Sequence, residues 1–187
     1  MEIRELKLKG VYEIQLKPNV DERGFFMRTF DDKIFEQAGL KHNWLQENHS
    51  LTLKKNTIRG LHLQLPPFSE TKLIRCIKGK VWDVFVDLRK DSSTFAHWDS
   101  IELSETAFNL VLVPRGFAHG FCTLTDNCEV TYKVDNYYSP SHEIGLLWND
   151  EDLKIKWPSN LPNLSKKDSK NLTLKEFIQK YKHIELP

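Results

Sequence analysis

The stretch TIRGLHLQLPP, residues 57–67, alternates apolar and polar side chains and then ends at two prolines. Such alternation predicts a β-strand, because successive side chains of a strand point to opposite faces. Strict alternation through the glycine places Ile58, His62 and Gln64 on one face and three leucines on the other. Arg59 interrupts the leucine face. Polar residues in this pattern fit either a solvated sheet face or a concave binding face, and the rest of the chain decides between the two.

Length and composition predict one domain. The chain has 187 residues, 40% of them hydrophobic, which is enough for a sizeable core. We expect a single domain over residues 1–187, with its core at about 11–158. The net charge of +1 predicts no nucleic-acid or membrane partner held by bulk charge. No apolar run approaches the roughly 20 residues of a bilayer span, and residues 1–10 contain no apolar signal core, so we expect a cytoplasmic protein.

The middle of the chain is a series of short apolar segments separated by turn residues. About eight short strands at such close spacing are typical of a sandwich or small barrel. Residues 78–80, KGK, predict a hairpin turn. Two short helices are expected as well. Residues 31–39 have aspartate at the start and glycine at the end, and residues 172–183 begin with the capping box of Thr173 and Glu176.

The stretch PRGFAHGF, residues 114–121, is the second informative motif. Its PxGxxH spacing occurs in cupin-type jelly rolls, where the histidine points into the barrel and often binds a metal beside an HxH pair. Here Gln64 stands where the second histidine of that pair would be. Two histidines and an amide are a poor ligand set for a transition metal. We therefore expect no metal, with His62 and His119 together on one concave face.

Seven blocks of sequence follow one another in a characteristic order: DERGFF, QENHS, IRGLHLQ, KLIRCIKGKVWDVFVDLRKDSSTF, VPRGFAHGF, TYKVDNYYSPSHEIGLLWND and LPNLSKKD. Through them the chain, from about residue 11 to 168, resembles the dTDP-4-dehydrorhamnose 3,5-epimerases. The resemblance implies a mostly β fold, a cupin-type jelly-roll sandwich or barrel with a few short helices, one of them near the C-terminus. It also implies cofactor-independent 3,5-epimerisation of a nucleotide-diphosphate-linked 4-keto-6-deoxy sugar, hexose or heptose, in surface-polysaccharide sugar biosynthesis.

The chemistry of such a reaction gives each implied catalytic residue a task. The C4 carbonyl acidifies the hydrogens on C3 and C5, so epimerisation needs a base, an acid on the opposite ring face and a group that stabilises the enolate oxygen. The resemblance implies that His62 is the base and that Asp168 orients its imidazole. It implies Tyr132 as the acid and Lys72 as the cation near the C4 oxygen. No cofactor is implied.

The resemblance also implies substrate-binding residues spread along the chain: Arg23, Phe26, Arg28, Gln46, Asn48, Arg59, His119, Tyr138, Glu143 and Lys167. Arg59 matches a residue that grips the diphosphate through forked, charge-assisted contacts. Tyr138 matches one that stacks on the base. In the family the DERGFF segment reaches into the neighbouring subunit's cavity, which implies a homodimer with this N-terminal segment exchanged.

Arg28 departs from the family pattern, because thymidine-using relatives usually carry glutamate at this position. Arginine has only donors and cannot accept the imide hydrogen of thymine, whereas it matches the adjacent acceptors O6 and N7 of guanine. The sequence therefore predicts a GDP-linked substrate rather than a dTDP-linked one. Other readings stay open: an epimerase of C3 alone or C5 alone, a metal-dependent cupin, and a non-catalytic sugar-binding jelly roll.

Overall fold

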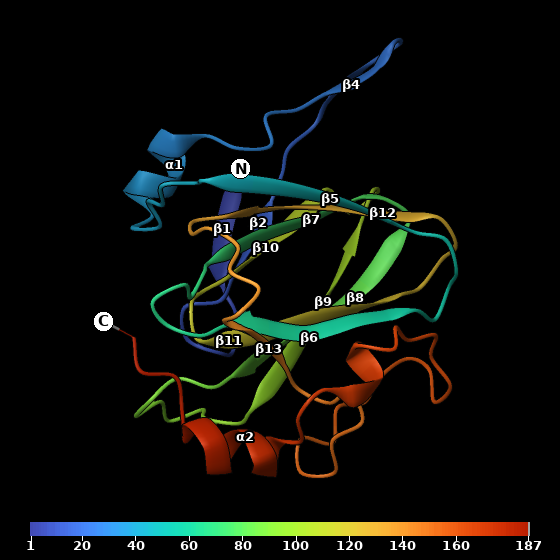
Figure 1. Cartoon of the computed structure of the whole chain (residues 1–187). Helices are drawn as coiled ribbons and strands as arrows, with labels where there is room; N and C mark the ends of the chain where they lie inside the picture. Colours follow the sequence, from blue (N-terminus) through green and yellow to red (C-terminus); the bar gives the residue numbers. More distant parts are fainter. Residues whose placement is uncertain (187) are drawn as a thin grey trace.

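Two antiparallel β-sheets form the body of the protein in the computed structural model, which describes residues 1–186 (Figure 1). The six-stranded sheet contains, in spatial order, β1 (Glu2–Glu5), β2 (Tyr12–Gln15), β10 (Asn109–Val113), β7 (Lys72–Lys78), β12 (Cys128–Val134) and β5 (Gln46–Thr52). The five-stranded sheet contains β13 (Glu143–Gly145), β6 (Ile58–Gln64), β11 (Phe117–Thr123), β8 (Lys80–Asp87) and β9 (Trp98–Ser104). The predicted mostly β, cupin-type jelly roll is confirmed.

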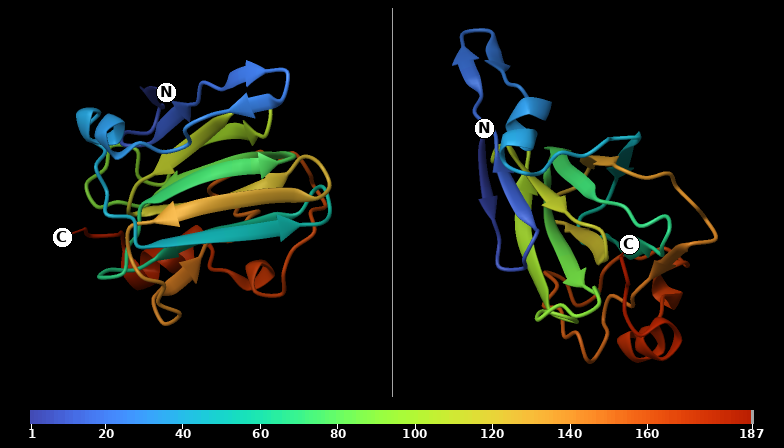
Figure 2. Two further views of the ribbon diagram at one scale, coloured as in Figure 1. Left: turned by 90° about the horizontal axis from the view of Figure 1, so that it is seen from above. Right: turned by 90° about the vertical axis from the view of Figure 1, so that its left-hand side faces the viewer.

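The remaining elements lie outside the two sheets. A separate hairpin of β3 (Asn19–Asp21) and β4 (Gly24–Phe26) stands away from the body (Figures 1 and 2). The helices are α1 (Asp32–Gln37), the 3₁₀ turn η1 (Asp168–Lys170) and α2 (Leu174–Tyr181). Within residues 1–186, no helix is long and apolar enough to cross a membrane. The predicted domain extends to residue 187, which lies outside the described residues.

Apolar side chains fill the space between the sheets at one end and leave a cavity at the other. Ile74 and Val111 of the six-stranded sheet meet Phe85 and Leu103 of the five-stranded sheet, and all four are fully buried. Burying side chains of this size contributes roughly 1.5–3 kcal/mol each relative to exposure. This packing fixes the distance between the two sheets, and therefore between the polar side chains that both sheets direct into the cavity.

Each sheet is also covered on its outer face. The helix α2 lies beneath the five-stranded sheet, where Phe177 joins a cluster with Leu61 and Val84 (Figure 1). The helix α1 covers part of the six-stranded sheet, where Phe35 packs in a cluster with Ile14. Both helices confirm their predicted signals. Asp31 caps α1, and the capping box of α2 is formed in both directions.

The strand β6 departs from strict alternation at its glycine. In the ladder between β6 and β11, His62 pairs with His119 but Arg59 pairs with Phe121, so three steps of β6 oppose two of β11. This is a β-bulge. The predicted face of Ile58 is therefore wrong, since Ile58 lies with the leucines in the cluster above α2. Arg59 instead lines a cavity together with His62.

Glycines make this bulge possible. Gly60 has φ +110°, and a Cβ on it would lie 2.6 Å from the Cα of Gly120. Only glycine tolerates both the backbone angle and this approach. The close contact brings β6 and β11 together at the point where each strand carries its histidine.

The predicted hairpin at residues 78–80 is also wrong. The strands β7 and β8 follow each other directly but belong to different sheets. Gly79, with φ +76°, turns the chain from one sheet to the other, and a Cβ there would lie 2.5 Å from the hydroxyl of Thr125. The turn signal was real, but it marks a corner of the jelly roll.

Candidate active site

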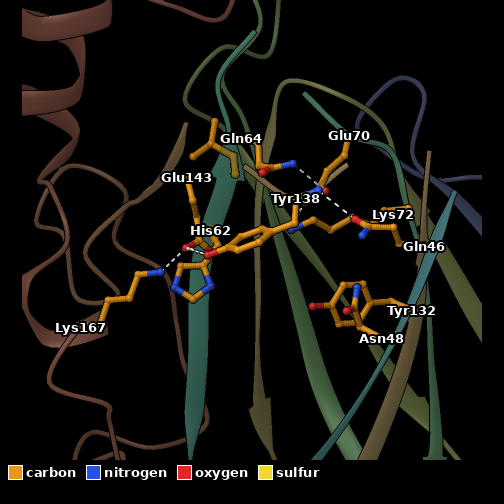
Figure 3. Close-up of a pocket in the computed structure, with 12 residues that line it drawn as sticks. Gln46, Asn48, His62, Gln64, Glu70, Lys72, Tyr132, Tyr138, Glu143 and Lys167 are labelled. Atoms are coloured by element: carbon orange, nitrogen blue, oxygen red, sulfur yellow. Dashed lines mark hydrogen bonds and ion pairs between the residues drawn. The ribbon is translucent and has the colours of Figure 1, made fainter. Parts of the chain in front are cut away.

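Two adjoining cavities of about 320 and 270 Å³ lie between the sheets, close to the lower end of the size range of small-molecule sites. The first is lined by Gln46, Asn48, His62, Leu63, Gln64, Glu70, Lys72, Tyr132, Val134, Tyr138, Glu143 and Lys167 (Figure 3). The second is lined by Ser50, Arg59, His62, Lys72, His119, Phe121, Val130, Tyr132, Ser165, Lys167 and Asp168. Because His62, Lys72 and Tyr132 line both, the two cavities form one site with these side chains at its centre.

His62 and Asp168 form an oriented pair. The distance from His62 Nε2 to Asp168 Oδ1 is 2.6 Å. A carboxylate only accepts, so Nε2–H donates and Nδ1 is left as the basic nitrogen. Burial opposes ionisation of Asp168, but the hydrogen bond and charge of His62, with further bonds from Ser165 and the Gly60 backbone, outweigh it and lower the pKa of Asp168. An imidazole held in one tautomer by an ionised carboxylate is suited to act as a general base.

Tyr132 enters the site from the other sheet. It lies on β12, whereas His62 lies on β6, and the Tyr132 hydroxyl points into the cavity that the imidazole also faces (Figure 3). Burial, followed by the charges of Glu70 and Glu143, raises the pKa of Tyr132 above its ordinary value of 10.0. The phenol is therefore protonated at neutral pH. A base and a proton donor face the same space from opposite sheets.

Lys72 supplies a positive charge at the centre of the site. It begins β7, is 9% exposed, and forms an ion pair of 3.3 Å with Glu70. An ammonium in a partly dehydrated cavity stabilises negative charge far better than one in water. Glu70, which comes from the loop before β7, was not among the predicted site residues.

His119 has a buried partner that the sequence did not reveal. Its Nε2 lies 3.0 and 2.9 Å from the two carboxylate oxygens of Asp83. Asp83 is fully buried, and burial raises its pKa although His119 and Lys72 oppose the shift. The available signal was a charged residue inside the apolar run VWDVFVD, residues 81–87. Buried charges in such runs are almost always paired.

A hydrogen-bonded group lies at the open side of the first cavity. The hydroxyl of Tyr138 donates to Glu143 at 3.0 Å, and Lys167 forms an ion pair with the same carboxylate (Figure 3). The backbone N–H of Tyr138 donates to the side chain of Gln46 at 2.8 Å. These side chains come from β5, from β13 and from the loops before β13 and η1, so residues far apart in sequence meet here.

Three of the predicted residues do not line either cavity. Arg23 and Phe26 lie on the hairpin that stands away from the body, where Arg23 pairs with Asp21 at 2.5 Å and Phe26 is 72% exposed. Arg28 follows the hairpin and pairs with Asp31 at 2.8 Å. All other predicted site residues line one of the two cavities.

Gln64 takes the place that a second metal-ligating histidine would need. Its amide is occupied by protein groups: Nε2 donates to the carbonyl of Phe68 and to Glu70, and Oε1 accepts from the N–H of Ser139 at 2.6 Å. In the part of the chain that the structure describes, no three His, Cys, Asp or Glu side chains gather in a way that could hold a metal ion.

Comparisons with known proteins place this fold and site in a class. The family description "dTDP-4-dehydrorhamnose 3,5-epimerase" matches residues 5–176. The epimerase of that name from Shigella flexneri is 45% identical over 169 residues, covering 90% of this chain and 93% of its own. The solved epimerase from Bacillus anthracis, with TDP and pyrophosphate bound, is 44% identical with a TM-score of 0.91, over 92% of this chain and 99% of that one.

A second solved relative was captured with a sugar nucleotide. The epimerase from Legionella pneumophila, in complex with dTDP-4-keto-L-rhamnose, is 35% identical with a TM-score of 0.88, over 93% of both chains. These relatives show that the chain is an isomerase of nucleotide-linked sugars. The chain belongs to the dTDP-4-dehydrorhamnose 3,5-epimerase family.

Proposed function

We propose that this epimerase inverts both C3 and C5 of a nucleotide-diphosphate-linked 4-keto-6-deoxy sugar by proton transfer alone. The observation that carries the proposal is the pairing of His62 with Asp168 opposite the protonated Tyr132, with the Lys72 ammonium at the same cavity. These are the base, the acid and the cation that the chemistry requires.

Each step then has a side chain of its own. His62 Nδ1 removes the proton from the carbon next to the carbonyl and becomes an imidazolium, which the Asp168 carboxylate stabilises. Lys72 stabilises the enolate oxygen. Tyr132 returns a proton to the same carbon from the opposite ring face, which inverts that centre. Proton exchange with solvent then restores the imidazole and the phenol. Every proton goes to or comes from a side chain, and we therefore propose that no cofactor takes part.

The remaining cavity residues suit the nucleotide diphosphate. Arg59 is fixed by its Nε donating to Thr52 at 2.9 Å and a terminal nitrogen donating to the Leu51 carbonyl at 3.1 Å. This pre-orders the guanidinium for a diphosphate. We assign Gln46, Asn48, Glu143 and Lys167 to the nucleotide, with Tyr138 stacking on its base.

We also propose a homodimer in which the β3–β4 hairpin enters the partner's cavity. What supports it is the exposure of apolar side chains on a projecting hairpin, with Val20 at 75%, Phe25 at 57% and Phe26 at 72%. Arg23 and Phe26 lie too far out on the hairpin to line their own cavity. Sedimentation analysis tests the dimer, and loss of nucleotide binding in Phe26→Asp tests the exchange. A monomer with full activity would contradict it.

The nucleobase of the substrate is a separate matter from the sugar chemistry. We propose a dTDP-linked substrate, supported by the pairing of Arg28 with Asp31, which occupies part of the guanidinium that would recognise guanine. The thymidine ligands named for the solved relatives support it as well. The sequence-based prediction of GDP stays a prediction. Comparing GDP and dTDP affinities in wild type and Arg28→Glu decides between them: tighter binding of GDP by wild type, reversed in Arg28→Glu, would favour the guanine reading.

The test of the function is incubation of wild type in D₂O with dTDP- and GDP-linked 4-keto-6-deoxyhexoses and with a heptose analogue. Deuterium and inversion at C3 and C5 are the expected result. Exchange at one carbon alone would identify a C3-only or C5-only epimerase. Binding without exchange would identify a sugar-binding jelly roll, and loss of exchange on chelation would identify a metal-dependent cupin.

A further inference from the structure

Glu70 is a carboxylate at the centre of the site to which the proposed proton transfers give no task. One of its oxygens accepts from Gln64 Nε2 at 2.9 Å, and the other lies 3.3 Å from Lys72 Nζ (Figure 3). The side chains of Glu70 and Lys72 are 10% and 11% exposed. Glu70 therefore bridges a neutral amide on β6 and the cation on β7 within a largely dehydrated cavity.

The amide that holds Glu70 is itself rigid. Besides Glu70, the carbonyls of Phe68 and Tyr137 lie 3.0 and 3.1 Å from Gln64 Nε2. The two N–H groups of the amide are therefore shared among three acceptors. Its Oε1 accepts from the N–H of Ser139. Gln64 is 3% exposed. Because backbone groups of Phe68, Tyr137 and Ser139 all bond to this amide, Gln64 is held in one orientation. It therefore gives the Glu70 carboxylate a fixed position.

Lys72 needs such a partner. Its ammonium ends a flexible four-carbon side chain, whose direction is not set by the backbone. Among residues 1–186, Glu70 is the one carboxylate within ion-pair distance of Lys72. Gln64 on β6 thus fixes the position of Glu70, and Glu70 in turn fixes the position of the Lys72 ammonium on β7.

A carboxylate is otherwise unfavourable at this place. The proposed reaction builds negative charge on an enolate in the same cavity, and a bare carboxylate nearby would repel it. Glu70 fits the site because Lys72 lies beside it. The charge of Glu70 is also second to burial among the causes that raise the pKa of Tyr132, which keeps that phenol protonated.

We propose that Glu70 is a positioning residue that acts through Lys72: it holds the ammonium where the enolate oxygen of the substrate forms. This inference rests on the proposed epimerisation. It assigns to Glu70 an effect on the rate of proton abstraction, and it requires that this effect disappear when Lys72 is absent.

The test is a double-mutant cycle of Glu70→Gln and Lys72→Ala, with solvent exchange at C3 and C5 measured under saturating substrate. Glutamine keeps an oxygen for the Gln64 amide and removes the charge. In the wild-type background we expect the exchange rate to fall about 10- to 100-fold, the loss typical of a misplaced catalytic group. KM should change by less than about threefold, because the group acts after binding. In the Lys72→Ala background we expect no further loss.

Two further variants sharpen the result. Glu70→Asp keeps the charge with a shorter reach and should recover part of the rate. Glu129→Gln is the matched control, since Glu129 pairs with Lys78 on the outside of β12, the strand that carries Tyr132. It should exchange as wild type does. Thermal unfolding confirms that each variant is folded.

The outcomes are separable. If wild type exchanges and Glu70→Gln matches it, or if the Glu70→Gln loss is the same with and without Lys72, the positioning role is wrong while the epimerase stands. A rise in KM alone would make Glu70 a substrate contact and would also overturn the proposal. If wild type does not exchange at all, the proposed function fails and this inference fails with it.

Discussion

Replacing Asp168 by asparagine removes the negative charge beside the proposed base, His62, and keeps the shape of the side chain that contacts it. Asp168 Oδ1 lies 2.6 Å from His62 Nε2, and the Asp168 side chain is 5% exposed. Charges centred about 4 Å apart interact by about 4 kcal/mol at an effective dielectric constant of about 20. That stabilisation acts on the imidazolium formed during proton abstraction and not on the neutral imidazole. Asp168→Asn should therefore reduce kcat by about 10³, since about 1.4 kcal/mol corresponds to tenfold in rate, with little change in KM.

The assay is position-resolved deuterium incorporation under saturating substrate, together with thermal unfolding of the variant. Asp150→Asn is the matched control. Asp150 is also buried, at 4% exposed, and its carboxylate accepts from the backbone of Asp152, Leu153 and Leu174, away from the cavity. It should lose stability but keep its turnover per folded molecule. An Asp168→Asn enzyme that turns over within tenfold of wild type would show that the Asp168 charge does not stabilise the imidazolium.

Three further predictions concern the acid, the folded state and the core. Tyr132→Phe should still exchange at C3 and C5 in D₂O while NMR shows less inverted product; equal loss of both would show that Tyr132 serves another role. Burial opposes ionisation of Asp87, but hydrogen bonds from Arg89, Ser92 and Thr94 lower its pKa, so its stabilisation is present above the ordinary carboxyl pKa of about 4 and is lost as the pH falls further. Asp87→Asn should lower the free energy of unfolding by about 3–5 kcal/mol at pH 7 in urea unfolding. It should also weaken the loss of stability below about pH 4; the same dependence of stability on pH as in wild type would argue against this role. Phe177→Ala should cost about 3–5 kcal/mol in the same experiment, since Phe177 is fully buried under the five-stranded sheet; a loss below about 1 kcal/mol would contradict this.

The jelly roll and both helices were predictable because their signals are local. Alternating strands, an aspartate cap at Asp31 and the capping box at Thr173 each act over a few residues. The face of Ile58 and the corner at Gly79 were not. Both depend on what a distant strand does at a glycine: β11 approaches Gly60, and the chain changes sheets at Gly79. A period-two pattern contains no information about such a bulge.

The sequence predicted site residues only at positions that match motifs of the family. His62 and Asp168 are 106 residues apart and meet because η1 packs against β6, which no spacing rule foresees. Asp83 and Glu70 were not assigned to the site, for different reasons. Asp83 does not line the cavity, and it contacts the site only through its hydrogen bond with His119. Glu70 sits in a polar turn where a charged residue is ordinarily a solvated one.

In the proposed mechanism one histidine, His62, removes the proton from both C3 and C5. The most direct measurement is deuterium incorporation from D₂O into the dTDP-linked 4-keto-6-deoxyhexose, resolved by position, for wild type beside His62→Asn. We expect wild type to label C3 and C5. His62→Asn should lose exchange at both carbons by at least about 100-fold, the usual minimum for a lost general base, while nucleotide binding is nearly unchanged. Exchange that persists at either carbon above a hundredth of the wild-type rate would contradict it.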